Sequence, residues 1–263
     1  MKNVTLSCLA ALAALTALPT GAADLPGGYW PVDRSQPILD KTRTIRLAPD
    51  LSGLTGGERE AVRHLLEAGG ILQRIYEDSR HPEARAALEG LEALHASMGG
   101  GPATRNLVDL YRLNQGPIAT TLENRREAFL PVAPEAPTRN VYPAGTTREE
   151  IDAFLAAHAG ERDAILGERT VVRRGTRDNA AQDLAVLVRY PVLDTLHPGL
   201  AARLRDVSEK PALHAFYAVP QAVAWADELM TVHGHLNRAA DAVESDDAEF
   251  ARYLRNRSRD LLS

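Results

Sequence analysis

The stretch TGGEREAVRHLLEAGGILQRIY, residues 55–76, carries the signals of a long amphipathic helix. Thr55 and Glu58 form a capping-box pattern, in which each side chain accepts a hydrogen bond from the backbone N–H of the other residue. Apolar residues then recur at three-and-four spacing, which predicts one buried face and a helix that runs to about Asp78. Gly69-Gly70 is expected to weaken or kink the centre of this helix.

Further helix signals lie on both sides of this stretch. Proline suits a first helical turn, where its missing N–H costs nothing, and threonine, serine or aspartate caps such a turn from outside. Apolar residues at helical spacing follow each of these signals. The helices so predicted start at Pro82, at Ala103, at Thr147, beyond Pro198, and at Ser245 or Asp246.

Only a few segments indicate β structure. Thr44–Leu47 is interpreted as a short strand within an extended lead-in, and residues 115–139, with four prolines, as an irregular segment. The β-branched runs Thr170–Val172 and Val186–Val188 suggest a hairpin or a strand packed on helices, although the second run could equally be helical. The sequence therefore predicts a mainly α fold: an irregular helical array with a minor β hairpin or short strands.

The first 23 residues have the features of a cleavable export signal. Leu6–Leu18 is nearly all apolar and small residues follow it, so we expect cleavage between Ala23 and Asp24. This gives a signal peptide, residues 1–23, and one helical region, residues 24–263, located in the periplasm or secreted. The apolar run is short for a membrane span, so no stable insertion is expected after cleavage, and an uncleaved anchor is the alternative.

The composition of the chain argues against nucleic acid as a partner and against disulfide bonds. The chain has 44% hydrophobic and 25% charged residues, as globular proteins do, and its net charge of −5 provides no basic field for nucleic acid. Paired arginines such as Arg125-Arg126 lie beside glutamates and are interpreted as solvated faces. Cys8, the only cysteine, lies in the signal segment, so the cleaved chain could form no disulfide.

The histidines do not follow a zinc-hydrolase pattern. Such sites need two histidines one helical turn apart with a glutamate between them, and no His-Glu dipeptide occurs here. His233 and His235 come nearest, but side chains two residues apart on a helix point about 200° away from each other. We interpret one of them as an interface histidine and the other as a surface histidine. The remaining histidines show no ligand spacing: His64, His81, His95, His158, His197 and His214.

Two other chemistries also lack their motifs. Gly-x-Ser-x-Gly, the elbow of serine hydrolases, does not occur in the sequence. Gly99-Gly100-Gly101 lacks the lysine of a phosphate-binding loop and is interpreted as a turn. The residues alone therefore identify no catalytic residue and no metal ligand, and they leave any binding residue unknown.

Several stretches, in this order, resemble the bacterial branch of the dipeptidyl peptidase III family, peptidase family M49. They are Thr44–Leu47 with Asp50–Leu54, Tyr111–Pro117, Asn140–Pro143 with Thr147–Ile151, Thr170–Arg174, and Ala251–Leu262. The resemblance spans nearly the whole chain beyond the signal segment and concerns the N-terminal portion of the family. It implies a zinc metallopeptidase, a hydrolase that binds the N-terminus of a peptide and cleaves it with metal-activated water.

The departure from the family concerns its chemistry. The His-Glu-x-x-x-His zinc motif, the glutamate-rich third-ligand motif and the main cleft residues of the family have no counterpart in this sequence, so no catalytic residue is transferred. The leading hypothesis is a non-catalytic N-terminal portion of an exported zinc-dependent dipeptidyl peptidase III-like protein, inactive alone. Zinc and a peptide substrate are expected only for an intact family member. The alternative is an exported helical binding or interaction module without enzymatic activity.

Overall fold

The structure, a computed structural model, describes residues 25–135 and 139–263. Helices predominate in these ranges, so the mainly α fold is confirmed. The helices are α1 Val32–Leu39, α2 Gly56–Arg80, α3 Ala84–Ser97, α4 Pro102–Asn114, α5 Arg148–Ala157, α6 Arg162–Ile165, α7 Arg177–Arg189, α8 Pro191–Leu196, α9 Leu200–Glu209, α10 Gln221–Ala224, α11 Ala226–Val243 and α12 Ala248–Asp260. The strands are β1 Ile118–Thr120, β2 Arg126–Ala128, β3 Thr170–Arg174 and β4 Phe216–Pro220, and short 3-10 turns are η1 Arg139–Val141, η2 Ala159–Glu161 and η3 Pro211–Leu213.

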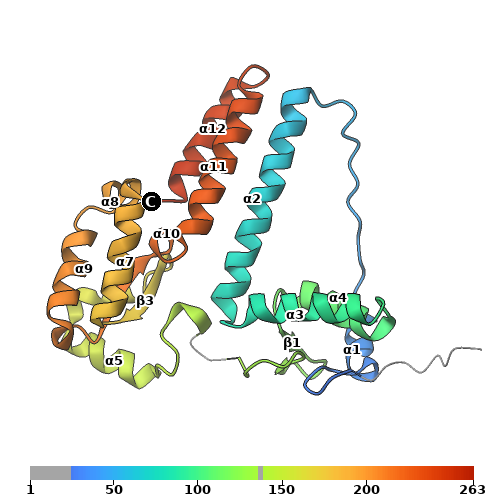
Figure 1. The fold of residues 1–263 in the computed structure, drawn as a ribbon, viewed down its shortest axis with the longest axis horizontal. Coiled ribbons are helices and arrows are strands. Elements are labelled where there is room, and N and C mark those ends of the chain that lie inside the picture. The colour runs from blue at the N-terminus through green and yellow to red at the C-terminus, as the bar shows by residue number, and fades with distance from the viewer. Residues whose placement is uncertain (1–24, 136–138) are drawn as a thin grey trace, which may run out of the picture.

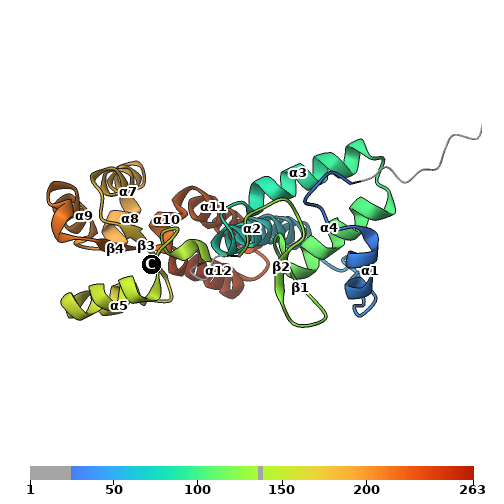
Figure 2. The same cartoon turned by 90° about the horizontal axis from the view of Figure 1, so that it is seen from below.

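Three helices, α2, α11 and α12, form the central layer of the molecule (Figure 1). On one side of this layer lie α1, α3, α4 and the β1–β2 sheet, and on the other lie α5 to α9 with the β3–β4 sheet. Figure 2 shows the same order from below, with the central helices seen nearly end-on. The contact between α2 and α11 is the most extensive between any two elements of the described ranges. The two outer groups are therefore held together largely through this helix pair.

The predicted start of α2 is confirmed at the level of individual hydrogen bonds. The Thr55 hydroxyl accepts from the backbone N–H of Glu58 at 3.1 Å, and the Glu58 carboxylate accepts from the N–H of Thr55 at 2.7 Å. The helix then continues through Gly69-Gly70 and ends at Arg80, two residues beyond the predicted end. The glycine pair therefore lies within one unbroken helix, and the expected weakening at this point stays a prediction.

Small side chains allow α2 and α11 to approach closely. The buried residues of α2 include Ala61, Ala68 and Ile71, and those of α11 include Ala239 and Ala240. At the start of α2 the approach is so close that a Cβ atom on Gly57 would lie 2.2 Å from the carbonyl oxygen of Ala242. Glycine is therefore required at position 57 by contact with another backbone, and not by its own helical conformation.

In the group around α1, α3 and α4, the structure differs from the sequence-based expectation in three segments. Residues 32–39 form a helix, α1, where an extended lead-in was expected, because Pro37 lies inside this helix and concealed it. Thr44–Leu47 forms no strand: Ile45 and Leu47 are 78% and 87% exposed and no other strand lies beside them. Residues 118–128, expected to be irregular, form the β1–β2 hairpin.

The core of this group explains why the short elements persist. Trp30, just before α1, meets Phe129, just after β2, edge-on with ring centroids 6.1 Å apart. Both rings are buried against α4, so hydrophobic burial by tertiary contact supports elements too short to be stable alone. The buried side chains of this core are Trp30, Ile38, Leu91, Leu107, Leu110, Tyr111, Ala119, Phe129 and Leu130.

The opposite group contains the β sheet that the sequence assigned only in part. Thr170–Arg174 is a strand as predicted, but its partner is β4, which runs antiparallel with Val171 opposite Val219. Val186–Val188 lies inside α7, so the helical alternative for this run is the correct one. Strand β4 falls in the part of the chain expected to be helical, and this expectation is wrong for residues 216–220.

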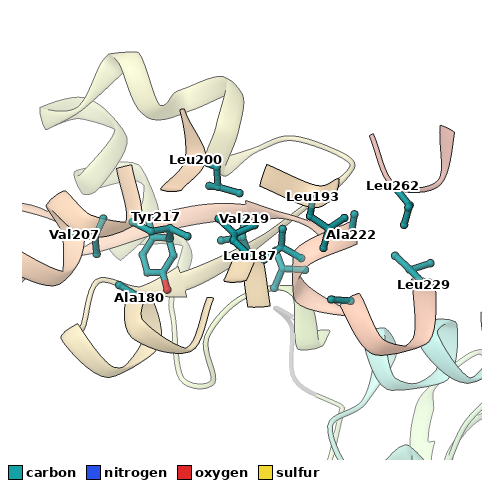
Figure 3. Close-up of a cluster of buried hydrophobic side chains, with 14 residues drawn as sticks. Ala180, Leu187, Leu193, Leu200, Val207, Tyr217, Val219, Ala222, Leu229 and Leu262 are labelled. Carbon is teal, nitrogen blue, oxygen red and sulfur yellow. The ribbon is translucent and has the colours of Figure 1, made fainter. Parts of the chain in front are cut away.

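The sheet and its helices enclose the largest buried cluster of the chain. Figure 3 shows Tyr217 and Val219 of β4 among side chains from α7, α8, α9 and α11, with Leu262 near the end of the chain. Leu204, Val207, Tyr217 and Val219 are fully buried. Leu229 of α11 is buried in this cluster.

The remaining helix predictions are confirmed within one or two residues. Helix α4 begins at Pro102, one residue before the predicted start, and α5 follows Thr147, whose hydroxyl accepts from the N–H of Glu150. The cap of α12 is Asp247, and not Ser245 or Asp246. The signal segment and its cleavage site between Ala23 and Asp24 lie outside the described residues. None of the described helices combines the length and apolar composition needed to cross a bilayer.

Adjacent glycines at the start of α2 provide a test of the α2–α11 contact. Gly57→Ala should destabilise the protein by about 1–3 kcal/mol, because the new methyl group must push the Ala242 carbonyl away. Gly56→Ala is the matched control, since a Cβ atom there meets nothing within 4 Å. It should leave the free energy of unfolding unchanged or raise it by up to about 1 kcal/mol through better helix propensity. Urea unfolding of both variants measures the difference, and equal effects would contradict the close approach.

Candidate functional site

Histidines gather in the central helix layer, where α11 presents them to both of its neighbours. His233 faces α12 and His235 faces α2, so the two side chains leave α11 on different sides as their spacing predicts. The expectation that one of them lies at the surface is wrong, because both are half-buried in helix interfaces. The reason is that α11 is covered by a helix on each side.

On the α12 side, His233 takes part in a hydrogen-bonded cluster with Ser258 and Asn237. The Ser258 hydroxyl lies 2.6 Å from His233 Nδ1, and Asn237 Nδ2 donates to that hydroxyl at 3.1 Å. Serine and histidine are two of the three residues of a hydrolase triad. Here, however, Ser258 is fully buried between the helices, and none of the described carboxylates bonds His233 to orient it. The cluster therefore joins α11 to α12 and does not form a nucleophile.

On the α2 side, His64 and His235 come together although they are separated by 171 residues in sequence. Their Nδ1 atoms lie 3.0 Å apart, and the Nε2 atom of His64 lies 3.3 Å from the Glu60 carboxylate. Arg63 reaches the same Nε2 atom at 3.1 Å. The sequence did not predict this pair, because the spacing of residues within one helix carries no information about a contact between two helices.

These residues do not fit the zinc site of the dipeptidyl peptidase III family. In the described ranges, no group of three or more histidine, cysteine, aspartate or glutamate side chains is arranged to hold a metal ion. The Glu60 carboxylate, which is nearest to the histidine pair, is bound by Arg63 at 2.6 and 3.0 Å. We therefore assign no catalytic step through a metal to any residue of this chain.

The other histidines form hydrogen bonds or ring contacts within the fold, and of these histidines His81 is buried. His81 bonds the carbonyl of Ala133, and His197 bonds the carbonyl of Leu262. His95 contacts the Thr104 hydroxyl at 2.8 Å, and His214 pairs with Asp206. His158 stacks on Phe154. Each histidine is accounted for by the fold.

A recess of about 380 Å³ opens where the central layer meets the β3–β4 sheet. Its floor is apolar and includes Leu72 of α2 and Trp225 before α11, while charged groups lie at the rim. Of these, Arg257 pairs with Asp260, and Arg169 lies just before β3. Such a recess can accommodate an apolar group next to an anionic one.

A larger hollow, of about 890 Å³, lies beside α5. Tyr142 and Ile151 supply apolar surface, and Arg139, Arg148 and Arg162 line its edge. Both hollows have the size of small-molecule or short-peptide sites. Neither lining includes a histidine, so neither hollow offers the usual general base for hydrolysis.

One carboxyl group is buried without being part of either hollow. Asp183 of α7 accepts a hydrogen bond from the Tyr217 hydroxyl of β4 at 2.7 Å, and Arg173 Nε lies 3.7 Å from the same oxygen. Burial raises the pKa of Asp183, and the Tyr217 hydroxyl and Arg173 act in the opposite direction. Burial likewise raises the pKa of the Tyr217 hydroxyl. The group fastens α7 to the sheet.

Comparison with solved structures finds chains of similar fold. The structure of DPP III from Caldithrix abyssi matches with a TM-score of 0.57 at 21% identity, over 81% of this chain and 32% of that chain. The structure of dipeptidyl-peptidase III from Corallococcus sp. strain EGB matches with a TM-score of 0.64 at 20% identity, over 89% of this chain and 36% of that chain. No protein-family model and no curated protein sequence matches the chain.

The fold of this chain is therefore that of part of a dipeptidyl peptidase III structure, which confirms the resemblance seen in the sequence. The chain spans about a third of the length of the two structures that it matches. At this level of identity the likeness establishes the fold, and the activity remains to be argued from the site.

The buried carboxyl group gives a pH-dependent prediction. Tyr217→Phe removes the donor to Asp183 and should lower the free energy of unfolding by about 1–3 kcal/mol at pH 7. The loss should be smaller at pH 4.5, because a carboxyl with a raised pKa in the folded state costs stability only as rising pH ionises it. Urea unfolding at the two pH values measures both effects.

The control for this variant is Tyr253→Phe, since Tyr253 is 54% exposed on α12. It should unfold as the wild-type protein does at both pH values. A Tyr217→Phe variant with the same stability loss at pH 7 and pH 4.5 would contradict the assigned role of the hydroxyl.

Proposed function

We propose that this chain forms the helical, non-catalytic N-terminal portion of an exported zinc-dependent metallopeptidase similar to dipeptidyl peptidase III, and that it does not hydrolyse peptides alone. The observation that carries the proposal is the fold shared with two dipeptidyl peptidase III structures over 81% and 89% of this chain. The ordered sequence resemblance over the same region also supports it.

The contacts of the histidines support the proposed inactivity. His233 and His235 are separated by the body of α11, and each has partners in a neighbouring helix. Releasing either for catalysis would leave a buried polar group unpaired, which costs about 1–3 kcal/mol. In this proposal the zinc ion and the reacting groups therefore belong to the part of the metallopeptidase beyond the region that matches this chain.

Export to the periplasm or the medium is part of the proposal and rests on residues 1–23. Their short apolar run and the small residues before Asp24 are typical of a cleaved signal peptide. A peptide would be the partner of the completed protein. The alternative function, an exported helical binding module, draws support from the recess of about 380 Å³ and the hollow of about 890 Å³.

An activity measurement tests the proposed inactivity. The purified 263-residue chain, incubated with zinc and an unblocked peptide, should release no dipeptide above the buffer blank, because the described side chains form no three-ligand metal site. An intact enzyme of the dipeptidyl peptidase III type, assayed beside it, is the positive control. Dipeptide release that requires zinc and disappears with a chelator would contradict the proposal.

The nucleotide sequence beyond the Ser263 codon separates the two functions. A continuing reading frame that encodes His-Glu-x-x-x-His supports the peptidase portion. A stop codon followed by unrelated sequence favours the binding module instead.

A further inference from the structure

The histidine pair between α2 and α11 limits which protonation states the two rings can adopt, in addition to its part in the packing. The two rings lie with centroids 5.3 Å apart, tilted by 54°, and their Nδ1 atoms face each other at 3.0 Å. His64 is 6% exposed, so water cannot readily replace its partners. At this distance one nitrogen must carry a proton and the other must accept it.

Two tautomers of neutral His64 fit the surrounding groups. With the proton on Nδ1, His64 donates to Nδ1 of His235 and its Nε2 accepts from Arg63 at 3.1 Å. With the proton on Nε2, which lies 3.3 Å from the Glu60 carboxylate, Nδ1 of His64 accepts from His235 instead. In either case both rings are neutral and one facing nitrogen donates to the other. A further proton on the accepting Nδ1 would place two N–H groups against each other.

The charged groups around His64 come from both helices, and the positive groups outnumber the one carboxylate. On α2, Glu60 lies 3.3 Å from His64 Nε2, whereas Arg63 is a cation at 3.1 Å and is itself paired with Glu60. On α11, Arg238 adds a second positive charge and His235 opposes a further proton. Burial, followed by Arg63, lowers the pKa of His64, and the Glu60 carboxylate only partly offsets this.

We propose that the His64–His235 pair makes the α2–α11 contact sensitive to acid. This contact, called the joint below, is closed while both rings are neutral and loosens when the pair takes up one further proton. Loosening of the joint would affect the arrangement of the whole molecule, because α2 connects the group of α1, α3 and α4 to the rest of the described chain. Ala61 and Ala68 pack on the same face of α2 as His64, so loosening there exposes the apolar contact.

The direction of the pH effect follows from linkage. The folded pair resists a proton that the separated histidines accept at their ordinary pKa of about 6.5. The contact is therefore at full strength above about pH 6.5 and weakens as the pH falls below it. Each unit of pH below this value favours the open form by up to about tenfold for one proton taken up on opening.

Hydrogen exchange of the full chain tests the joint without any substitution. Between pH 6.5 and pH 5.5, protection of the buried amides of α2 and α11, corrected for the intrinsic rate, should fall by about fivefold. The amides of Leu204 and Tyr217, in the other core, should not lose protection over this range, because a carboxyl with a raised pKa, such as that of Asp183, favours folding as the pH falls. Protection that stays constant in α2 and α11, or that falls equally in both cores, would overturn the proposal.

Variants and a titration complete the test. In His64→Gln/His235→Gln, which cannot take up the proton, the fall in melting temperature from pH 7.5 to pH 5.5 should be clearly smaller than in the wild type. His158→Gln, at an exposed histidine, is the matched control and should keep the wild-type fall. If the double variant does not fold, NMR titration of His64 in the wild type decides: a midpoint below about 6.5 supports the joint, and a midpoint at or above it refutes it.

Discussion

The packing of α2 against α11 is the contact on which the rest of this structure depends. Two helices of 25 and 18 residues meet through small side chains, with Gly57 touching the Ala242 carbonyl at one end. Because α12 covers the other side of α11, α11 becomes the middle helix of a three-helix layer. The smaller helices and the two short sheets are positioned by attachment to this layer.

The same contact explains why two nearby histidines of α11 do not converge on one site. Two residues apart on α11, His233 and His235 are used by different neighbours, one by α12 and one by α2. A zinc peptidase needs its imidazoles to converge, and helix geometry makes these diverge. The likeness to dipeptidyl peptidase III structures and the absence of such a site in the described ranges are therefore compatible.

The sequence was informative where signals are local. The capping boxes at Thr55 and Thr147 and the proline at the start of α4 predicted helix starts within one residue or two, since each acts within a single turn. Strand β4 and the His64–His235 pair could not be predicted in this way. Both depend on partners far away in the chain, and burial by tertiary contacts overrides the local pattern. The two hollows are also products of assembly, because each is lined by several elements.

Contacts between methyl groups test the central packing most directly. In NMR spectra of the methyl-labelled chain at pH 7.5, the account predicts cross-peaks between Ala61, Ala68 or Ile71 of α2 and Val232, Leu236 or Ala239 of α11. Such peaks require the two helices to lie within a few ångströms of each other. Spectra in which these methyl groups show contacts only within their own helix would contradict the account.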